Sequence, residues 1–306
     1  MAAVGDTPAL RRPRVSMVGA RMREAAWGYG FVSIPMAVFG LFFVYPFGYM
    51  LYISFYNWGI LGSQGYVGTA NYRQVLHDPI FHTALKNIAE YTIGVVPLEM
   101  ALGLSLALIV NSKIRGQKFF RSAFYFPSIT SSVAITTIAL FLFHSDGFVN
   151  KLFGFHTAWF TTASTDTWAI VGLNAWTTSG TIMLWYLAAL QSIPTDVYEA
   201  AALDNTGEWR TFWRITFPLL RPAHFFVMVV FGVGALKLFD QSYIASGGSG
   251  GPNYSLYNPV LYIYRAAFAN GSSQFGIAAA AGVVYFVLIF GLTIVQWLTV
   301  GRREST

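Results

Sequence analysis

The stretch of sequence that decides the fold runs from Phe275 to Thr299 and reads FGIAAAAGVVYFVLIFGLTIVQWLT. It contains no Asp, Glu, Lys or Arg, and it exceeds the roughly 20 apolar residues with which a helix crosses the hydrocarbon core of a bilayer. Inside hydrocarbon every backbone polar group must find its partner within the segment, and an α-helix meets that requirement. The stretch therefore predicts a transmembrane helix.

Similar apolar runs recur throughout the 306-residue chain. Two of them contain charged residues, namely Glu90 and Glu99 in the second run and Lys237 and Asp240 in the fifth. The runs are continuous, whereas a transmembrane β-barrel would show alternating strands of about ten residues. We therefore predict an all-α polytopic membrane protein with six transmembrane helices, at residues 29–56, 87–110, 122–144, 167–190, 223–246 and 275–299.

The composition points the same way. Only 10% of the residues are charged and 55% are hydrophobic, and the mean hydropathy is +0.51. Soluble domains carry roughly 25% charged residues, so an ordinary cytosolic globular protein, a disordered chain and a simple nucleic-acid binder are excluded. The absence of cysteine excludes a disulfide framework, a thiolate metal site and a cysteine nucleophile.

The basic residues are distributed unevenly between the predicted loops. Fourteen of the 19 Lys and Arg residues fall in segments that alternating helices place on one side, namely 1–28, 111–121, 191–222 and 300–306. Short loops rich in Lys and Arg stay in the cytoplasm. Both termini are therefore predicted to be cytoplasmic tails (1–28 and 300–306) of a six-helix domain at 29–299. The first apolar run is too long for a cleaved signal peptide, and the net charge of +6 reflects topology rather than nucleic-acid binding.

No nucleotide-binding or metal-binding motif is present in the sequence. The chain has no G-x-x-x-x-G-K-[ST] loop and no H-E-x-x-H motif, and its five histidines are scattered. The segment Gly247-Gly248-Ser249-Gly250-Gly251 matches the G-x-S-x-G pattern of hydrolases, but that pattern requires a preceding strand and a following helix. Here a transmembrane helix precedes it and Pro252 follows, which indicates a flexible glycine loop. We expect no catalytic residue, metal or cofactor in this chain.

The predicted cytoplasmic loop at residues 191–222 carries seven charged residues between two apolar runs. Pro194 ends the fourth helix. Asp196, with Glu199 three residues later, predicts a capping box at the start of a short helix over 197–204.

After this short helix, Asn205 or Gly207 suits a left-handed cap. A second amphipathic stretch follows over 208–217, with aromatic residues interleaved with arginines, and Pro218 and Pro222 break it. The loop is either a membrane-surface connector between two spans or a docking element for a cytoplasmic partner.

The residues of this loop resemble a known family. Glu199-Ala200-Ala201, Asp204-Asn205 and Ile215-Thr216-Phe217-Pro218 are similar, in residues and in spacing, to the EAA loop of bacterial ABC importer permeases. Asn205 replaces the usual Gly, whose left-handed conformation Asn tolerates, and Phe217 replaces the usual Leu. Three other segments resemble the carbohydrate-uptake subgroup, which includes the maltose and glycerol-phosphate permeases: Val67-Gly68 with Asn71-Tyr72, Lys113-Ile114-Arg115-Gly116, and Gly251-Pro252.

The resemblance implies a type I ABC importer permease in a bacterial-type inner (plasma) membrane, which is not itself an enzyme. Its substrate would be a sugar, an oligosaccharide or a related polyol. Its partners would be the lipid bilayer, a second homologous but non-identical permease, two ABC ATPase subunits that hold ATP and Mg, and an extracellular solute-binding protein. In the family the EAA helix seats on the ATPase, which implies coupling contacts at Glu199, Ala200, Ala201, Asp204, Asn205 and Gly207.

The substrate pathway is expected where intramembrane polar residues converge, because polar groups in hydrocarbon are costly and tend to face the bundle interior. Lys237 and Asp240 stand three residues apart on one predicted helical face and are expected to pair. Lys237 permits an anionic substrate such as a phosphorylated polyol, although Asp240 would neutralise it. The alternative is a cluster of hydrogen bonds between helices. The candidate pathway residues are Asn174, Trp176, Thr178, Lys237, Phe239, Asp240 and Gln241.

A second hypothesis from another class is an ion-coupled secondary carrier for a small polar solute, with Glu99, Lys237 and Asp240 as the coupling groups. Such carriers tend to show paired broken helices in two repeated halves. The sequence shows no matching halves, and this hypothesis leaves the cytoplasmic loop unexplained.

Overall fold

The computed structural model of the chain describes residues 17–112, 116–204, 206–269 and 274–299. It divides into two compact units, residues 1–52 and residues 53–306, which are described separately. Residues 1–16 and 300–306 of the predicted tails, and Asn205 of the predicted coupling loop, lie outside the described residues.

The N-terminal unit is one long helical segment. It consists of α1 (Met17–Phe39), the π-helical turn η1 (Gly40–Val44) and α2 (Tyr45–Ile53). The part from Glu24 to Ile53 is long and apolar enough to cross a membrane, which agrees with the predicted first span. The helix begins earlier than residue 29 and ends before Tyr56, where a strand begins.

The second unit is helical apart from one small hairpin. Its elements after the hairpin are α3 (Ala70–His77), α4 (Pro79–Asn111), α5 (Gln117–Tyr125), η2 (Phe126–Ile129), α6 (Ser132–Leu142), α7 (Phe148–Phe153), α8 (Asp166–Gln191), α9 (Thr195–Leu203), α10 (Glu208–Thr211), η3 (Phe212–Thr216), α11 (Phe217–Leu219), α12 (Arg221–Leu236), α13 (Asp240–Ser246), η4 (Pro252–Tyr254), α14 (Pro259–Phe268) and α15 (Phe275–Thr299).

The hairpin corrects the prediction of a purely helical chain. Strands β1 (Tyr56–Gly59) and β2 (Gly62–Tyr66) pair antiparallel just after the first span. The amide of Asn71 donates to the carbonyls of Ser54 and Tyr56, each at 2.9 Å, and holds the hairpin against α3. Glycine is frequent here, and Tyr56, the last residue of the predicted first span, packs against Tyr66 across the hairpin instead.

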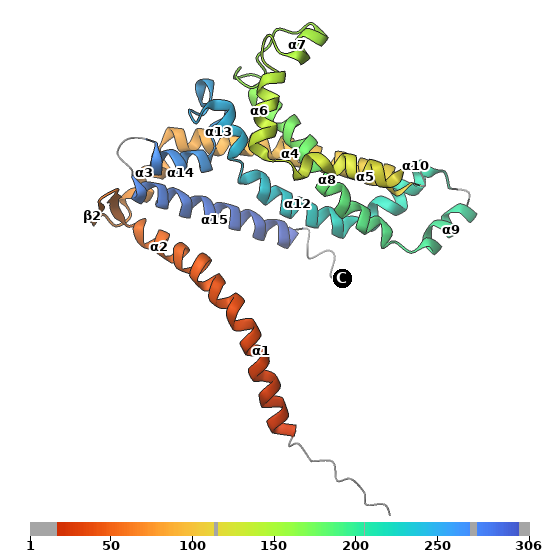
Figure 1. Cartoon of the computed structure of the whole chain (residues 1–306), viewed down its shortest axis with the longest axis horizontal. Helices are drawn as coiled ribbons and strands as arrows, with labels where there is room; N and C mark the ends of the chain where they lie inside the picture. Colours follow the sequence, from red (N-terminus) through yellow and green to blue (C-terminus); the bar gives the residue numbers. More distant parts are fainter. Residues whose placement is uncertain (1–16, 113–115, 205, 270–273, 300–306) are drawn as a thin grey trace, which may run out of the picture. The chain divides into compact units, whose positions relative to one another are not determined.

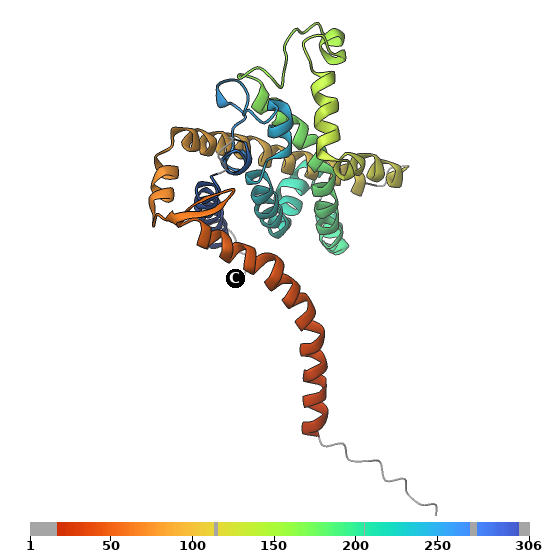
Figure 2. The same ribbon diagram turned by 60° about the vertical axis from the view of Figure 1, so that its left-hand side comes forward.

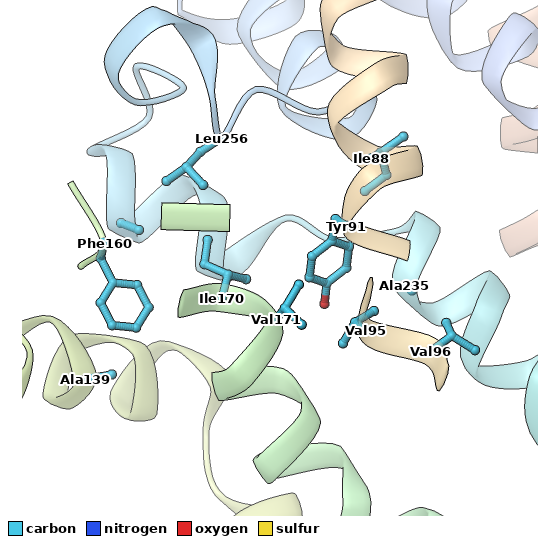
Figure 3. Packing of buried hydrophobic residues seen from close by; sticks show 11 residues of the cluster. Ile88, Tyr91, Val95, Val96, Ala139, Phe160, Ile170, Val171, Ala235 and Leu256 are labelled. Carbon is cyan, nitrogen blue, oxygen red and sulfur yellow. The ribbon is translucent and has the colours of Figure 1, made fainter. Parts of the chain in front are cut away.

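The two longest helices of this unit, α4 and α8, pack along each other at its centre (Figures 1 and 2). Figure 3 shows Tyr91 and Val95 of α4 facing Val171 of α8, with Ala235 of α12 nearby. Lipid tails are as apolar as these side chains, so close packing rather than expulsion of water holds the helices together.

Two of the six predicted spans are not single helices. The third, predicted at 122–144, is divided between the α5–η2 segment and α6, which are bent by 93° at Thr130–Ser131. Thr130 has an extended backbone (φ −82°, ψ 147°), and Pro127 precedes the bend.

The fifth span, predicted at 223–246, is interrupted between α12 and α13 at residues 237–239. The hydroxyl of Tyr285 on α15 donates to the carbonyl of Leu236, which the interruption leaves without its helical partner. Hydropathy did not reveal either break, because interrupted helices keep the same apolar composition.

Among the described residues, four helices are long and apolar enough to cross a membrane, at Glu24–Ile53, Pro79–Asn111, Arg221–Ser246 and Phe275–Thr299, and the bent pair α5–α6 makes a fifth candidate. The predicted fourth span is helical throughout as α8, but its Thr, Ser and Asn residues lower its hydropathy. Apolar length and composition thus support five of the six predicted spans within the described residues, and α8 does not meet that criterion.

Replacing Gly180 with alanine is expected to destabilise the protein. A Cβ at this position on α8 would overlap the carbonyl oxygen of Phe124 and approach the Cα of Tyr125 to 2.9 Å. Backbone atoms cannot move aside as a side chain does, so we expect the free energy of unfolding to fall by about 1–3 kcal/mol. Gly172→Ala is the control on the same helix, because its Cβ would meet nothing within 4 Å and alanine favours a helix by about 1 kcal/mol over glycine. Equal thermal unfolding midpoints of the two variants in detergent would contradict this account.

Candidate functional site

The predicted cytoplasmic loop forms four short helical elements, α9, α10, η3 and α11, between the long helices α8 and α12. Pro194 occupies the N-cap position of α9 and makes no side-chain capping hydrogen bond. The predicted capping box of Asp196 and Glu199 is therefore wrong, because both residues lie within the helix, where a Pro-initiated start has shifted the first turn.

The end of α9 also differs from the prediction. Thr206 closes it, with its backbone N–H and its hydroxyl both donating to the carbonyl of Ala201, at 3.2 and 2.5 Å. Gly207 has φ −65° and ψ 154° and starts α10, so the left-handed cap predicted for it is absent. The alternative position, Asn205, lies outside the described residues.

The residues predicted to contact an ATPase divide into an outward and an inward group. Glu199, Ala200, Asp204 and Gly207 are exposed, whereas Ala201 is only 5% exposed and packs inside the loop. In Figure 1, α9 and α10 lie at the opposite end of this unit from α3 and α14. The loop therefore exposes a short helix, α9, at one end of the helix bundle, and the exposed face includes the small side chain of Ala200 beside Glu199.

A polar cavity of about 330 Å³, which we call the chamber, lies between α4, α8 and the break that separates α12 from α13. A second polar cavity of about 250 Å³ adjoins it along the bend between η2 and α6, and Ser132 and Thr178 line both. Six of the seven predicted pathway residues line the chamber: Asn174, Thr178, Lys237, Phe239, Asp240 and Gln241.

Asn174 joins three helices within the chamber. Its amide nitrogen donates to the hydroxyl oxygen of Tyr91 on α4 at 2.7 Å, and its amide oxygen accepts from Gln241 on α13 at 2.8 Å. The predicted pathway residues thus also form the alternative that the sequence left open, a hydrogen-bond cluster between helices. The same polar groups tie the walls together and line the cavity.

Lys237 and Asp240 do not form the predicted ion pair. The helix ends at Leu236 and restarts at Asp240, so the two side chains no longer share a helical face. Within the described part of the chain, the ion pair that forms is Lys86–Glu90, with Nζ and Oε1 3.6 Å apart. Lys237 and Asp240 are both exposed and face the chamber as separate charges.

The two glutamates of α4 have different environments, which the sequence could not separate. The side chain of Glu90 is 57% exposed in its pair with Lys86. Glu99 is 4% exposed and lines the chamber. Tyr91 and Ser132, which sequence reasoning missed, line it too. The signal for Glu99 in the sequence was a carboxyl group within an apolar run, which Glu90 shares.

Trp176 is the one predicted pathway residue outside the chamber. It is 56% exposed and lines an apolar cavity of about 690 Å³ with Trp168 and Phe126. Two residues along a helix rotate the side chain by about 200°, so Trp176 points away from Asn174. Trp176 therefore does not line the chamber with the other candidate pathway residues.

The glycine-rich segment at 247–251 is a loop, as predicted. Gly247, Gly248, Gly250 and Gly251 all have positive φ. The hydroxyl of Ser249 donates to the carbonyl of Ser246 at 2.6 Å rather than to a histidine. This arrangement has neither the preceding strand nor the base of a hydrolase site.

Comparison with known proteins agrees with this architecture. Residues 99–303 match the family model described as the inner membrane component of binding-protein-dependent transport systems. The lactose transport system permease protein LacF of Rhizobium radiobacter is 31% identical over 284 residues, which cover 90% of this chain and 95% of LacF. The trehalose/maltose transport system permease protein MalF of Thermococcus litoralis is 30% identical over 289 residues, covering 92% and 96%.

The fold is shared with solved transporters. A crystal structure of a bacterial ABC transporter involved in the import of the acidic polysaccharide alginate matches with a TM-score of 0.76 and 21% identity, covering 93% of this chain and 98% of that one. The resemblance read from the EAA loop is thereby confirmed at the level of the family. The chain belongs to the inner membrane components of binding-protein-dependent transport systems and is a permease subunit of an ABC importer.

Proposed function

We propose that this permease forms one half of the path by which a neutral sugar or oligosaccharide crosses the inner membrane. The observation that supports this most directly is the position of the chamber at two interrupted helices. Non-helical backbone at membrane depth is tolerated where it lines a water-filled cavity. Both breaks, at 130–131 and at 237–239, contribute residues that line one of the two adjoining polar cavities.

The chemistry of the chamber suits a neutral polyhydroxyl compound. Asn174, Thr178 and Gln241 supply hydrogen-bond donors and acceptors, and Phe239 supplies an aromatic face for the apolar side of a sugar ring. The charged residues are two carboxyl groups and one ammonium group, which favours a neutral substrate over an acidic one. The names of LacF and MalF, which are permeases for lactose and for trehalose and maltose, support the same class.

The membrane topology we propose has six spans with both termini in the cytoplasm. The sixth span, besides the five apolar candidates, is α8, whose polar residues then face the chamber instead of lipid. This orientation rests on the 14 basic residues of the four predicted cytoplasmic segments. It puts α9 on the side where ATP is available.

The exposed surface of α9 is the proposed site at which ATP hydrolysis is coupled to sugar import. Glu199 and Ala200 are exposed on it, and a small side chain beside a charged one lets a partner approach closely. We propose that a groove on an ABC ATPase subunit receives this helix. The complete importer then contains two such ATPases with their ATP and Mg, a second, non-identical permease and an extracellular solute-binding protein.

Import into proteoliposomes tests this function. The permease is reconstituted with its partner permease, its ATPases and its solute-binding protein, and labelled lactose, maltose and an alginate oligosaccharide are offered in turn. We expect ATP-dependent import of a neutral sugar that a protonophore does not abolish. Import that needs no ATPase and collapses with the proton gradient would support the ion-coupled carrier instead. Import of the alginate oligosaccharide alone would overturn the assignment to neutral sugars.

A further inference from the structure

A partly buried aromatic cluster lies between the coupling loop (residues 191–222) and the central helix α8. The ring of Phe217 in α11 packs against the ring of His224 in α12, with centroids 4.5 Å apart. His224 in turn contacts Tyr186 of α8, where its Nδ1 and the tyrosine hydroxyl form a hydrogen bond of 2.8 Å. Tyr186 is completely buried. These three residues, which we call the brace, connect the three elements in one unbroken series of contacts.

The loop end of the brace is attached to α9 as well. The hydroxyls of Tyr198 on α9 and Thr216 lie 3.3 Å apart, and Thr216 directly precedes Phe217. Residues 192–194 connect α8 to α9 along the chain, and the contact between Tyr198 and Thr216 adds a second connection through the loop. The brace closes a ring of contacts from α9 through η3 and α12 back to α8.

The opposite end of the brace leads toward the chamber. Tyr186 and Thr178 lie eight residues apart on α8, about 12 Å along its axis, and Thr178 lines the chamber. Packed interiors transmit displacement because they have little free volume to absorb it. A movement of α9 therefore reaches Thr178 in the wall of the chamber only if the loop and α8 move together.

We propose that Tyr186, His224 and Phe217 are positioning residues that make the coupling loop, α8 and α12 move as one body. This inference rests on the proposed function, in which α9 receives the movement of an ATPase. It identifies the side chains that transmit this movement from α9 to the helices that line the chamber. None of the three is expected to contact the ATPase or the sugar. Their substitution should therefore weaken the coupling of ATP hydrolysis to sugar import and leave the binding of the ATPase and of the sugar unchanged.

The test compares Tyr186→Phe, which removes only the hydroxyl, with Tyr262→Phe. Tyr262 on α14 is another buried tyrosine; its hydroxyl donates to the carboxylate of Asp78 at 2.7 Å, and neither residue lines the chamber. In the reconstituted complex we expect Tyr186→Phe to raise the ATP hydrolysed per sugar imported about threefold to tenfold. The amount of ATPase that co-purifies should not change. Tyr262→Phe should leave the ratio at the wild-type value.

His224 offers a second pair of variants. His224→Leu fills the space without a hydrogen-bonding group, and His224→Asn places an amide near the position of Nδ1, where it can still bond to Tyr186. We expect the leucine variant to uncouple ATP hydrolysis from import and the asparagine variant to restore most of the coupling. Equal ratios in both variants, or a loss that only follows the amount of assembled complex, would overturn the proposal.

A measurement without sugar separates this proposal from the proposed function. Because the chain has no cysteine, spin labels at Leu203→Cys on α9 and Val230→Cys on α12 report one distance, and both positions are exposed. We expect the Tyr186→Phe change to broaden the distance distribution about twofold and Tyr262→Phe to leave it unchanged. An unchanged distribution in both would refute the brace. Failure of the wild-type complex to import any sugar would refute only the proposed function.

Discussion

Glu199→Lys is expected to release the ATPase subunits from the permease and to reduce sugar import at least tenfold. Glu199 is exposed on α9 beside Ala200, where a partner surface can approach closely. Truncating or reversing one partner of a desolvated interfacial charge pair costs about 2–5 kcal/mol, or roughly 30-fold to several thousandfold in affinity. Co-purification of the ATPase in detergent and ATP-dependent import in proteoliposomes measure the two effects.

Glu208→Lys is the matched control for this experiment. It makes the same change of charge in the same loop, at an exposed position on α10 outside the EAA motif. We expect it to keep the ATPase and most of the import. The docking assignment is wrong if Glu199→Lys retains both, or if the two variants lose them equally.

Ala201 is less suitable for such a test, although it belongs to the same motif. It is 5% exposed, and its carbonyl accepts both hydrogen bonds from Thr206. An aspartate there would distort the loop before any partner binds. Ala200, which is exposed, is the position at which a larger side chain would obstruct docking alone.

Glu99→Gln is expected to reduce sugar import at least tenfold while the protein stays as stable as the wild type. Glu99 is 4% exposed and lines the chamber, and no ion pair with it forms among the described residues. A hydrogen bond to a charged group contributes about 1.5–3 kcal/mol, which corresponds to roughly 10-fold to 100-fold in substrate passage. Burying an uncompensated charge is costly, so the neutral amide should not lower the unfolding midpoint.

Glu90→Gln provides the control on the same helix. Its carboxyl group pairs with Lys86 at the surface, and exposed pairs of this kind contribute only about 0.3–0.5 kcal/mol. We expect import by this variant to stay within twofold of the wild type. The initial rate of import and the thermal midpoint are measured for both variants. Import by Glu99→Gln at the wild-type rate, or an equal decrease in both, would exclude Glu99 from the pathway.

Much of the helical architecture was predictable, because the free energy of placing a residue in hydrocarbon depends mainly on that residue itself. Helices that can cross a membrane can therefore be recognised from a continuous stretch of sequence. The last helix covers 275–299 as predicted, and α8 covers the predicted 167–190. The family could also be recognised, since the EAA loop is a local pattern of residues and spacing. Errors at the ends, such as α4 beginning at Pro79 rather than near residue 87, arose where amphipathic turns extend a helix beyond its apolar run.

The site was predictable only in part, because it is formed by residues that lie far apart in the sequence. The polar residues of two predicted helices were expected to converge, and six of seven line the chamber. Helical rotation places Trp176 on another face, and the break at 237–239 separates Lys237 from Asp240. The environment that distinguishes Glu99 from Glu90 is created by α8, whose residues lie far away in sequence.

The sequence by itself determined that this protein is a helical membrane permease, because hydrophobicity and the EAA pattern are properties of short segments. Only the tertiary structure decided where its helices break and which polar groups meet. The hydrogen bond between Asn174 and Tyr91 joins residues 83 positions apart, and that between Tyr186 and His224 joins residues 38 positions apart. Such contacts depend on how whole helices pack against one another. The free energy of packing is determined by two distant segments together, so neither segment alone reveals which of its residues will meet.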